Sequence, residues 1–160
     1  MAKREKIPRT TKNGSVAVSE RLKVFNKTQL FGVLATNDSG HPYTSLISFA
    51  MTPDLTKVIF ATPKETRKYK NILNSKSVAI LIDNRSNTRK NLMETEAITI
   101  IGEARLVRRG KTRDELVALF LKKHPDLEDF IQSKTTALIV VDAVRCIHVG
   151  KFQTISVWEC

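Results

Sequence analysis

The sequence has 160 residues, of which 41% are hydrophobic, and a formal net charge of +11 at pH 7. This length and apolar content favour one domain with a packed core and argue against a chain that is disordered throughout. The longest apolar runs, Val78–Ile82 and Ala137–Val141, are far shorter than the roughly 20 residues that a membrane-spanning helix needs. The N-terminus is charged and lacks the apolar stretch of a signal peptide, so we expect a cytoplasmic protein with no membrane partner.

The positive charge is unevenly distributed, because more than half of the excess lies within residues 1–27. We expect residues 1–18 to form a basic, partly disordered arm and residues 19–160 to form the domain. Further basic clusters lie at residues 64–76, 85–90 and 105–113. Such clusters attract polyanions, membranes or phosphorylated small molecules without distinguishing among them. Since only 6% of residues are aromatic and no nucleic-acid-binding motif is present, a nucleic-acid partner rests on charge alone and is not expected.

The potential metal ligands are scattered along the sequence. Cys146 and Cys160 have neither metal-site spacing nor a disulfide framework, so both are expected to be structural, with Cys146 a buried thiol in a strand. The three histidines, His41, His124 and His148, form no recognisable metal motif. We therefore expect no metal site.

The first part of the domain is expected to contain a short helix followed by three strands. The helix is predicted at residues 19–25, and the strands are predicted at residues 30–36, 43–52 and 57–61. The turn-forming residues 37–40 join the first two strands as a hairpin. Because the connections are short, these three strands are expected to form an antiparallel meander.

The second of these strands has two different faces. Ile47, Phe49 and Met51 make one face bulky and apolar, whereas the opposite face is mostly small or hydroxylated, with Thr44 and Ser48 among its residues. This pattern is typical of a half-exposed strand. It would also let a flat ring lie close to the backbone, and both interpretations stay open at this point.

The rest of the chain adds strands and short helices. Strands are predicted at residues 77–83, 96–107, 136–142 and 145–152, with Gly102 marking a bulge or a tight bend. A second capping box, Thr112-Arg113-Asp114-Glu115, predicts a helix start, and Pro125 ends that helix before a further helical turn or two. About seven strands and three or four short helices indicate a mainly β (α+β) protein built on an antiparallel sheet.

Polar residues with a possible ligand-binding role gather between residues 61 and 71. Thr62-Pro63-Lys64-Glu65 has the pattern of a capping box and predicts a helix start, and Tyr69, Ile72 and Leu73 have helical spacing for burial. Free backbone N–H groups, two hydroxyls and two cations would meet there, as a phosphomonoester site requires. An ordinary capped helix with a solvated basic face explains the same residues.

At this level of detail the sequence resembles the pyridoxamine 5′-phosphate oxidase-like split-barrel flavoproteins over residues 20–152. The residues that carry the resemblance are Leu30–Thr36, His41–Ser45 with the strand to Phe49, Ile59-Phe60-Ala61-Thr62, Thr66-Arg67-Lys68-Tyr69 with Asn71-Ile72, and Val78–Asp83. The resemblance implies a homodimeric antiparallel split β-barrel that binds FMN at the subunit interface.

Particular residues receive roles from this resemblance. Thr62, Thr66, Arg67 and Lys68 would bind the FMN phosphate. The strand Thr44-Ser45-Leu46-Ile47 would lie along the isoalloxazine ring through its backbone, and the loop containing Asn84 and Arg85 would approach the cofactor. No residue is assigned as catalytic.

The substrate is not defined by the resemblance. The vitamin oxidases carry a basic residue where this chain has Ser48, and an Arg-Gln pair where it has Glu96-Ala97. The expected function is therefore an FMN-binding oxidoreductase acting on an unknown small molecule. Two alternatives remain, a deazaflavin-dependent reductase on the same barrel and a non-catalytic flavin or haem carrier with His148 as a conceivable iron ligand.

Overall fold

The computed structural model describes residues 15–150 and 154–160, with side chains from Val18 onward. Most of the predicted arm and the end of the strand predicted at 145–152 lie outside the described residues. In chain order the elements are α1 (Ser15–Thr28), β1 (Phe31–Asp38), β2 (His41–Ser48), β3 (Ala50–Met51), β4 (Lys57–Pro63), α2 (Arg67–Asn74), β5 (Ser77–Asp83), the 3-10 turn η2 (Arg89–Asn91), β6 (Ala97–Val107), α3 (Lys111–Lys123), the 3-10 turn η3 (Pro125–Leu127), α4 (Glu128–Gln132), β7 (Thr136–Gly150) and β8 (Thr154–Glu159).

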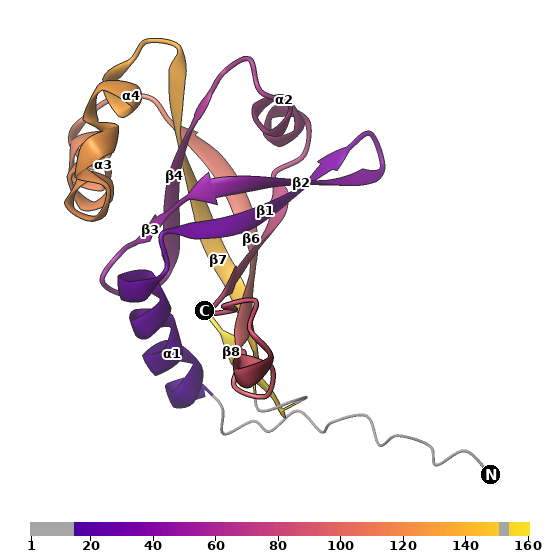
Figure 1. Cartoon of the computed structure of the whole chain (residues 1–160). Coiled ribbons are helices and arrows are strands. Elements are labelled where there is room, and N and C mark those ends of the chain that lie inside the picture. The colour runs from indigo at the N-terminus through magenta and orange to yellow at the C-terminus, as the bar shows by residue number, and fades with distance from the viewer. Residues whose placement is uncertain (1–14, 151–153) are drawn as a thin grey trace.

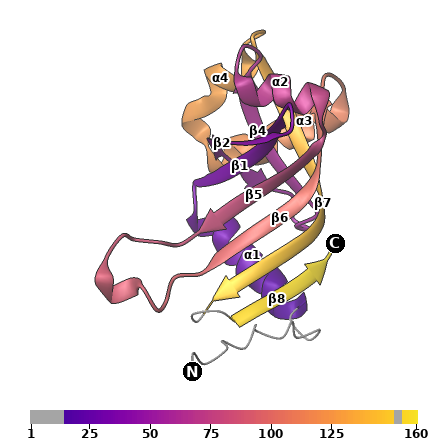
Figure 2. The same cartoon turned by 90° about the vertical axis from the view of Figure 1, so that its right-hand side faces the viewer.

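The strands form one curled antiparallel sheet, as the sequence predicted (Figure 1). Its eight strands follow the order β2-β1-β5-β6-β7-β4-β3, with β8 added beside β7. One edge of β7 pairs with β6, whereas β4 and β8 share its other edge, β4 pairing with residues 136–142 and β8 with residues 145–150 (Figure 2). The long strand β7 therefore lies between β6 on one side and both β4 and β8 on the other.

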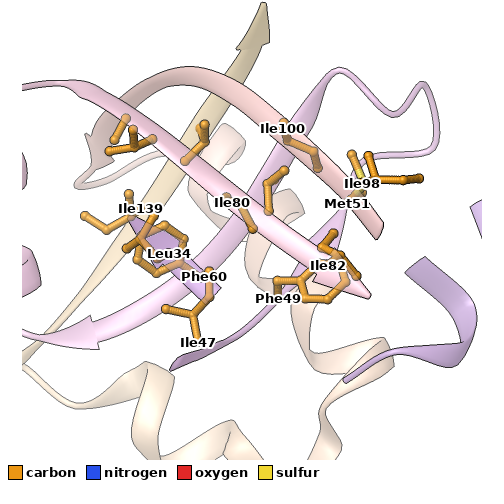
Figure 3. Close-up of a cluster of buried hydrophobic side chains, with 14 of the residues drawn as sticks. Leu34, Ile47, Phe49, Met51, Phe60, Ile80, Ile82, Ile98, Ile100 and Ile139 are labelled. Carbon is orange, nitrogen blue, oxygen red and sulfur yellow. The ribbon is translucent and has the colours of Figure 1, made fainter. Parts of the chain in front are cut away.

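Two hydrophobic clusters occupy the two sides of strands β4 and β7. Phe60 and Ile139 belong to the larger cluster inside the curled sheet (Figure 3). Helix α1 completes this cluster with Leu22 and Phe25. The side chains of β4 and β7 that point to the opposite face of the sheet, such as Val140, pack against α3 and α4. Because both faces of β7 are covered, its first half is continuously apolar, which explains the run Ala137–Val141.

Several predicted boundaries need correction. The strand predicted at 43–52 is divided, because β2 pairs with β1 only as far as Ser48 and β3 then pairs with β4. The meander therefore continues into β4 only through Ala50 and Met51. The strands predicted at 136–142 and 145–152 are one element, β7, and β8 was not predicted. Helix α1 begins at Ser15, and Val18 is fully buried in the core.

The second predicted capping box does not form. Helix α3 starts at Lys111, directly after Gly110, whose φ of 95° lies in the left-handed region that glycine adopts without strain. Gly110 occupies the cap position and makes no side-chain cap bond, so Thr112 lies inside the helix. The backbone rather than a hydroxyl side chain therefore defines this helix start.

The prediction of a bulge or bend at Gly102 is confirmed. Ile101 faces Arg145 while Gly102 faces Ala143, so the register between β6 and β7 shifts and Val144 is the extra residue. Pairing with β4 ends at Asp142 and pairing with β8 begins at Arg145, on either side of the same point. The sheet therefore bends where β7 changes partners.

None of the described helices is long and apolar enough to cross a membrane.

A partly buried lysine beside Phe49 gives a prediction about pH dependence. The Lys123 ammonium lies 3.6 Å from the centroid of the Phe49 ring and 3.5 Å from Oδ1 of Asn26, with no carboxylate partner among the described residues. Burial lowers the pKa of Lys123 from 10.5 to about 7. Between these pH values the unfolded chain binds the additional proton, so the free energy of unfolding should rise with pH in this window.

Lys123→Met should therefore stabilise the protein more at pH 6, where the wild-type ammonium is charged in the fold, than at pH 9. After allowance for partial exposure and for the contact with the Phe49 ring, we expect a gain of about 1 kcal/mol at pH 6, or roughly 2–4 °C in melting temperature. Thermal melts across this range measure it, with the exposed neighbour Lys122→Met as the control. A gain that is equal at both pH values would contradict the prediction.

Candidate functional site

The junction between β4 and α2 brings two hydroxyl groups together. Thr62, almost completely buried at the end of β4, lies with its Oγ1 2.9 Å from Oγ1 of Thr66. Thr66 Oγ1 also donates to the Pro63 carbonyl at 2.9 Å and accepts from the Tyr69 N–H at 3.4 Å as the helix cap. The two threonines therefore fix the turn that leads into α2.

The helix begins later than predicted. Pro63 still pairs with Thr136, and the Lys64 N–H donates to the Thr135 carbonyl at 2.9 Å, so strand pairing continues through the residues taken as a capping box. The cap is Thr66 rather than Thr62, and the helix starts at Arg67. Pro63 acts here as a turn residue, because its carbonyl accepts both the N–H and the hydroxyl of Thr66.

Lys68 stands at the edge of a cleft of about 260 Å³. Strands β2 and β4 supply one wall through Leu46, Ser48 and Thr62, and the opposite wall is apolar, with Phe120 and Phe130 among its residues. Lys68 has no ion pair or hydrogen bond to any described residue, and burial lowers the pKa of its ammonium. An anion in the cleft would provide the partner that this partly desolvated cation lacks.

Strand β2 presents its backbone at this cleft. It is the first strand in the sheet order, so one of its edges has no strand neighbour among the described residues, and N–H and C=O groups there remain available. Leu46, Ile47 and Ser48 line the cleft, while Thr44 lies further along the same exposed strand. Ser45 has a buried hydroxyl that finds no partner within the described part of the chain.

Arg67 points away from the cleft. Its guanidinium donates to Oδ2 of Asp38 at 2.8 Å, at the end of β1, and it does not line the cleft. The two adjacent cations of α2 therefore have different surroundings, since Arg67 is paired with a carboxylate and Lys68 is not.

Asn84 and Arg85 lie beside a different depression. The Asn84 side-chain oxygen accepts the Glu96 N–H at 2.7 Å, which closes the base of the long β5–β6 loop. Arg85 pairs with Asp83 at 3.1 Å and lines a hollow of about 180 Å³ on the outer side of β1. Leu46 lines both this hollow and the Lys68 cleft, so the two depressions adjoin along β2.

A positioning residue that sequence reasoning did not select lies in α2. Asn71 is buried and donates through Nδ2 to Oγ1 of Thr36 at 2.9 Å, and Thr36 in turn contacts the Tyr43 carbonyl at 3.3 Å. This chain of hydrogen bonds fixes α2 against β1 and β2. Asn71 takes the inward position beside Ile72, whereas Leu73, predicted as buried, is more than half exposed. The signal available in the sequence was a polar residue inside the apolar stripe of the helix.

A separate basin of about 850 Å³ lies between α3, α4 and the start of β7. Its cations are Lys64, Arg108, Arg109, Arg113 and Lys134, with Asp114 as the acidic group of the lining. Part of the basic cluster predicted at residues 105–113 therefore faces this basin rather than the Lys68 cleft.

His148 lies at the opposite end of β7 from the residues that pair with β4. Its ring is partly buried beside Glu96, whose Oε1 lies 3.7 Å from Nε2, and Glu96 also pairs with Arg21 of α1. The described residues hold no group of three His, Cys, Asp or Glu side chains placed to bind a metal ion. His148 thus belongs to a polar cluster under α1 and lines none of the three depressions described above.

A curled antiparallel half-barrel with a polar strand-to-helix junction defines the split-barrel class of proteins. A model of the pyridoxamine 5′-phosphate oxidase family matches residues 18–150, and the chain belongs to this family, which confirms the resemblance seen in the sequence. A search of curated proteins by sequence found no match.

Solved structures with the same fold include proteins whose names refer to different ligands. A haem-binding protein from Mycobacterium smegmatis superposes with a TM-score of 0.78 at 16% identity, over 89% of this chain and 57% of that one. The haem storage protein HutZ from Vibrio cholerae gives 0.68 at 19% identity, over 79% and 89%. An FAD-binding protein from Mesorhizobium loti gives 0.64 at 10% identity, over 81% and 92%. The chain thus spans little more than half of the mycobacterial protein, and these likenesses establish the fold alone.

Proposed function

We propose that the protein binds FMN in the Lys68 cleft and acts, as a homodimer, as an oxidoreductase on a small molecule. The observation that carries the proposal is the partly buried Lys68 ammonium, which faces the cleft without an anionic partner among the described residues. A phosphate bound there would restore the favourable interaction that burial removes. Thr62 lines the cleft and Thr66 lies beside it, and their hydroxyls would exchange their present hydrogen bonds, to each other and to the Pro63 carbonyl, for bonds to the same phosphate.

The flavin ring would lie against the free edge of β2. Its N–H and C=O groups can hydrogen-bond to the polar side of an isoalloxazine ring, and the small side chain of Ser48 leaves space close to the backbone. FMN would supply the redox chemistry when bound. The residues of this chain hold the phosphate, orient the ring and exclude water from one of its faces.

The incomplete enclosure supports the homodimer. The cleft of about 260 Å³ is smaller than typical small-molecule sites, which occupy roughly 300–1,000 Å³. Leu30, Phe31 and Leu46, all at least half exposed, adjoin it on the outer side of β1 and β2. A second copy related by a two-fold axis would cover these side chains and close both sites at once. Arg85 on the neighbouring hollow would then approach the flavin of the partner.

One experiment tests the ligand and the assembly together. The purified protein is incubated with FMN, with a deazaflavin or with haem and sedimented while absorbance is followed at the wavelength of each ligand. We expect stoichiometric FMN to sediment with a species of twice the chain mass. Haem or deazaflavin binding without FMN binding would overturn the choice of cofactor, and a monomer carrying stoichiometric FMN would overturn the shared site.

Haem is the second candidate because two of the structural neighbours are named as haem proteins. The chain offers His148 as a possible ligand, but this side chain lies under α1 among Arg21 and Glu96, away from the Lys68 cleft. FMN is therefore the ligand that the geometry of the cleft favours.

A further inference from the structure

The two cysteines of the sequence lie in contact, although they are 14 residues apart. Sγ of Cys146 is 3.5 Å from Sγ of Cys160. Cys146 lies on β7 with its side chain fully buried in the main core, whereas Cys160 follows β8 and is exposed. A buried thiol is thus in contact with one that solvent can reach.

The register of the sheet explains this contact. Cys146 faces Trp158 across the β7–β8 ladder, and the Cys160 N–H donates to the Val144 carbonyl at 2.9 Å, so the ladder continues to Cys160. The two cysteines are diagonal neighbours on the same side of the sheet. Diagonal Cα atoms lie roughly 7–8 Å apart, just beyond the span of about 4.4–6.8 Å that a disulfide bridges, so the bond requires a small backbone movement. Because Cys160 lies beyond the end of β8, it can make the small inward movement that brings the sulfurs to about 2.05 Å.

We propose that Cys146 and Cys160 form an oxidisable pair that a low-molecular-weight disulfide converts to an intrachain disulfide between β7 and the residue after β8. The Cys160 thiolate attacks one sulfur of the small disulfide and releases the first small thiol. Cys146 then gives up its proton and attacks the Cys160 sulfur, which breaks the mixed disulfide and releases the second small thiol. The two protein thiols lose two electrons and two protons, and the small disulfide gains them.

The difference in exposure determines the order of these steps. Cys160 is the sulfur that an oxidant can reach from solvent, and Cys146 is the resolving thiol held against it. Burial raises the pKa of both thiols, so each must lose a proton before it attacks: Cys160 in the first step and Cys146 in the second. The second step is intramolecular, and the mixed disulfide should not accumulate in the wild-type chain.

The bond would fasten the last strand of the sheet. Strand β8 pairs only with β7 among the described strands, and it packs against α1. A covalent link at residue 160 would prevent β8 from separating from β7 at this end. The local opening of β8, which an edge strand otherwise undergoes more readily than the core, should therefore become rarer.

The test uses the full chain and oxidised glutathione as the small disulfide. Native protein is incubated with oxidised glutathione, free thiols are blocked, and the intact mass is measured. We expect the loss of two hydrogen atoms, which a reducing agent reverses, together with slower amide exchange along β8. Cys146→Ser should instead accumulate a stable glutathione adduct on Cys160, and Cys160→Ser should react little because its remaining thiol is buried.

Other outcomes would overturn the proposal. A glutathione adduct that persists in the wild-type chain would show that Cys146 does not resolve it, and a covalently linked pair of chains would show that Cys160 prefers another molecule. Equal yields of disulfide from the native chain and from the chain unfolded in guanidinium would show that the fold does not bring the thiols together. The readouts are a mass and an exchange rate, so they are independent of cofactor binding.

Discussion

Lys68→Ala should weaken FMN binding by about 10- to 150-fold and leave the affinity for riboflavin nearly unchanged. A charge-assisted hydrogen bond is worth roughly 1.5–3 kcal/mol, which corresponds to this range of dissociation constants. Lys68 faces the cleft and is paired with no described residue, so removing its ammonium should remove a phosphate contact without breaking a structural one. Riboflavin lacks the phosphate, so its affinity for the protein should not change.

Flavin fluorescence titrations with both ligands measure these affinities, and Lys70→Ala is the matched control. Lys70 lies on the same helix, is exposed and does not line the cleft, so its removal changes the net charge equally. Equal losses for FMN and riboflavin in Lys68→Ala would place the phosphate elsewhere. An equal loss of FMN affinity in both lysine variants would show that general attraction, rather than direct contact, holds the phosphate.

Gly102→Ala is expected to destabilise the fold by about 3 kcal/mol or more, a fall of roughly 6–12 °C in melting temperature. A Cβ at this position would overlap the Asp142 carbonyl oxygen and lie 2.9 Å from Cγ1 of Val141. Both obstacles belong to β7 in the middle of the sheet, where the backbone has little freedom to move. The close approach of two strands at the bend therefore requires glycine.

The control for this variant is Gly32→Ala on β1. Its added Cβ would meet Cγ2 of Ile80 at 3.2 Å and the Leu81 carbonyl oxygen at 3.3 Å, contacts that small shifts can relieve. Thermal and denaturant unfolding of the two variants should separate them clearly. A Gly102→Ala protein as stable as Gly32→Ala would mean that β7 moves away from the bend at little cost.

Periodicity and turn residues were sufficient to predict most strands of this sheet. The strand at 77–83 has the predicted bounds, and the face containing Ile47, Phe49 and Met51 is buried as its alternation required. Pairing over long distances was not predictable in this way. The split between β2 and β3 occurs because β3 leaves β1 and joins β4, and no local pattern encodes that exchange of neighbours.

The candidate site shows the same division between local and distant information. The sequence identified the hydroxyls and cations around Thr66, and the structure brings Thr62, Thr66 and Lys68 to one junction. The sequence could not show that Asp38 pairs with Arg67, because the two residues meet only after β1 and α2 pack together. Proline at residue 63 fitted a helix start equally well, but strand pairing with Thr136 held it in β4.

The bulge in β7 determines the side of the sheet on which the Cys146 side chain lies. Before the bulge the odd-numbered residues Ile139 and Val141 point into the main core, and after it the even-numbered Cys146 does so, while Arg145 faces solvent. If the same sequence ran through this point without a bulge, odd-numbered residues would point inward along the whole strand, which would turn Arg145 toward the core and Cys146 outward. The contact of Cys146 with Cys160 thus depends on Val144 being accommodated as a bulge. Length changes in this chain should consequently be tolerated in the β5–β6 loop and at the bulge residue Val144, whereas a residue gained or lost elsewhere in β7 should turn core side chains outward.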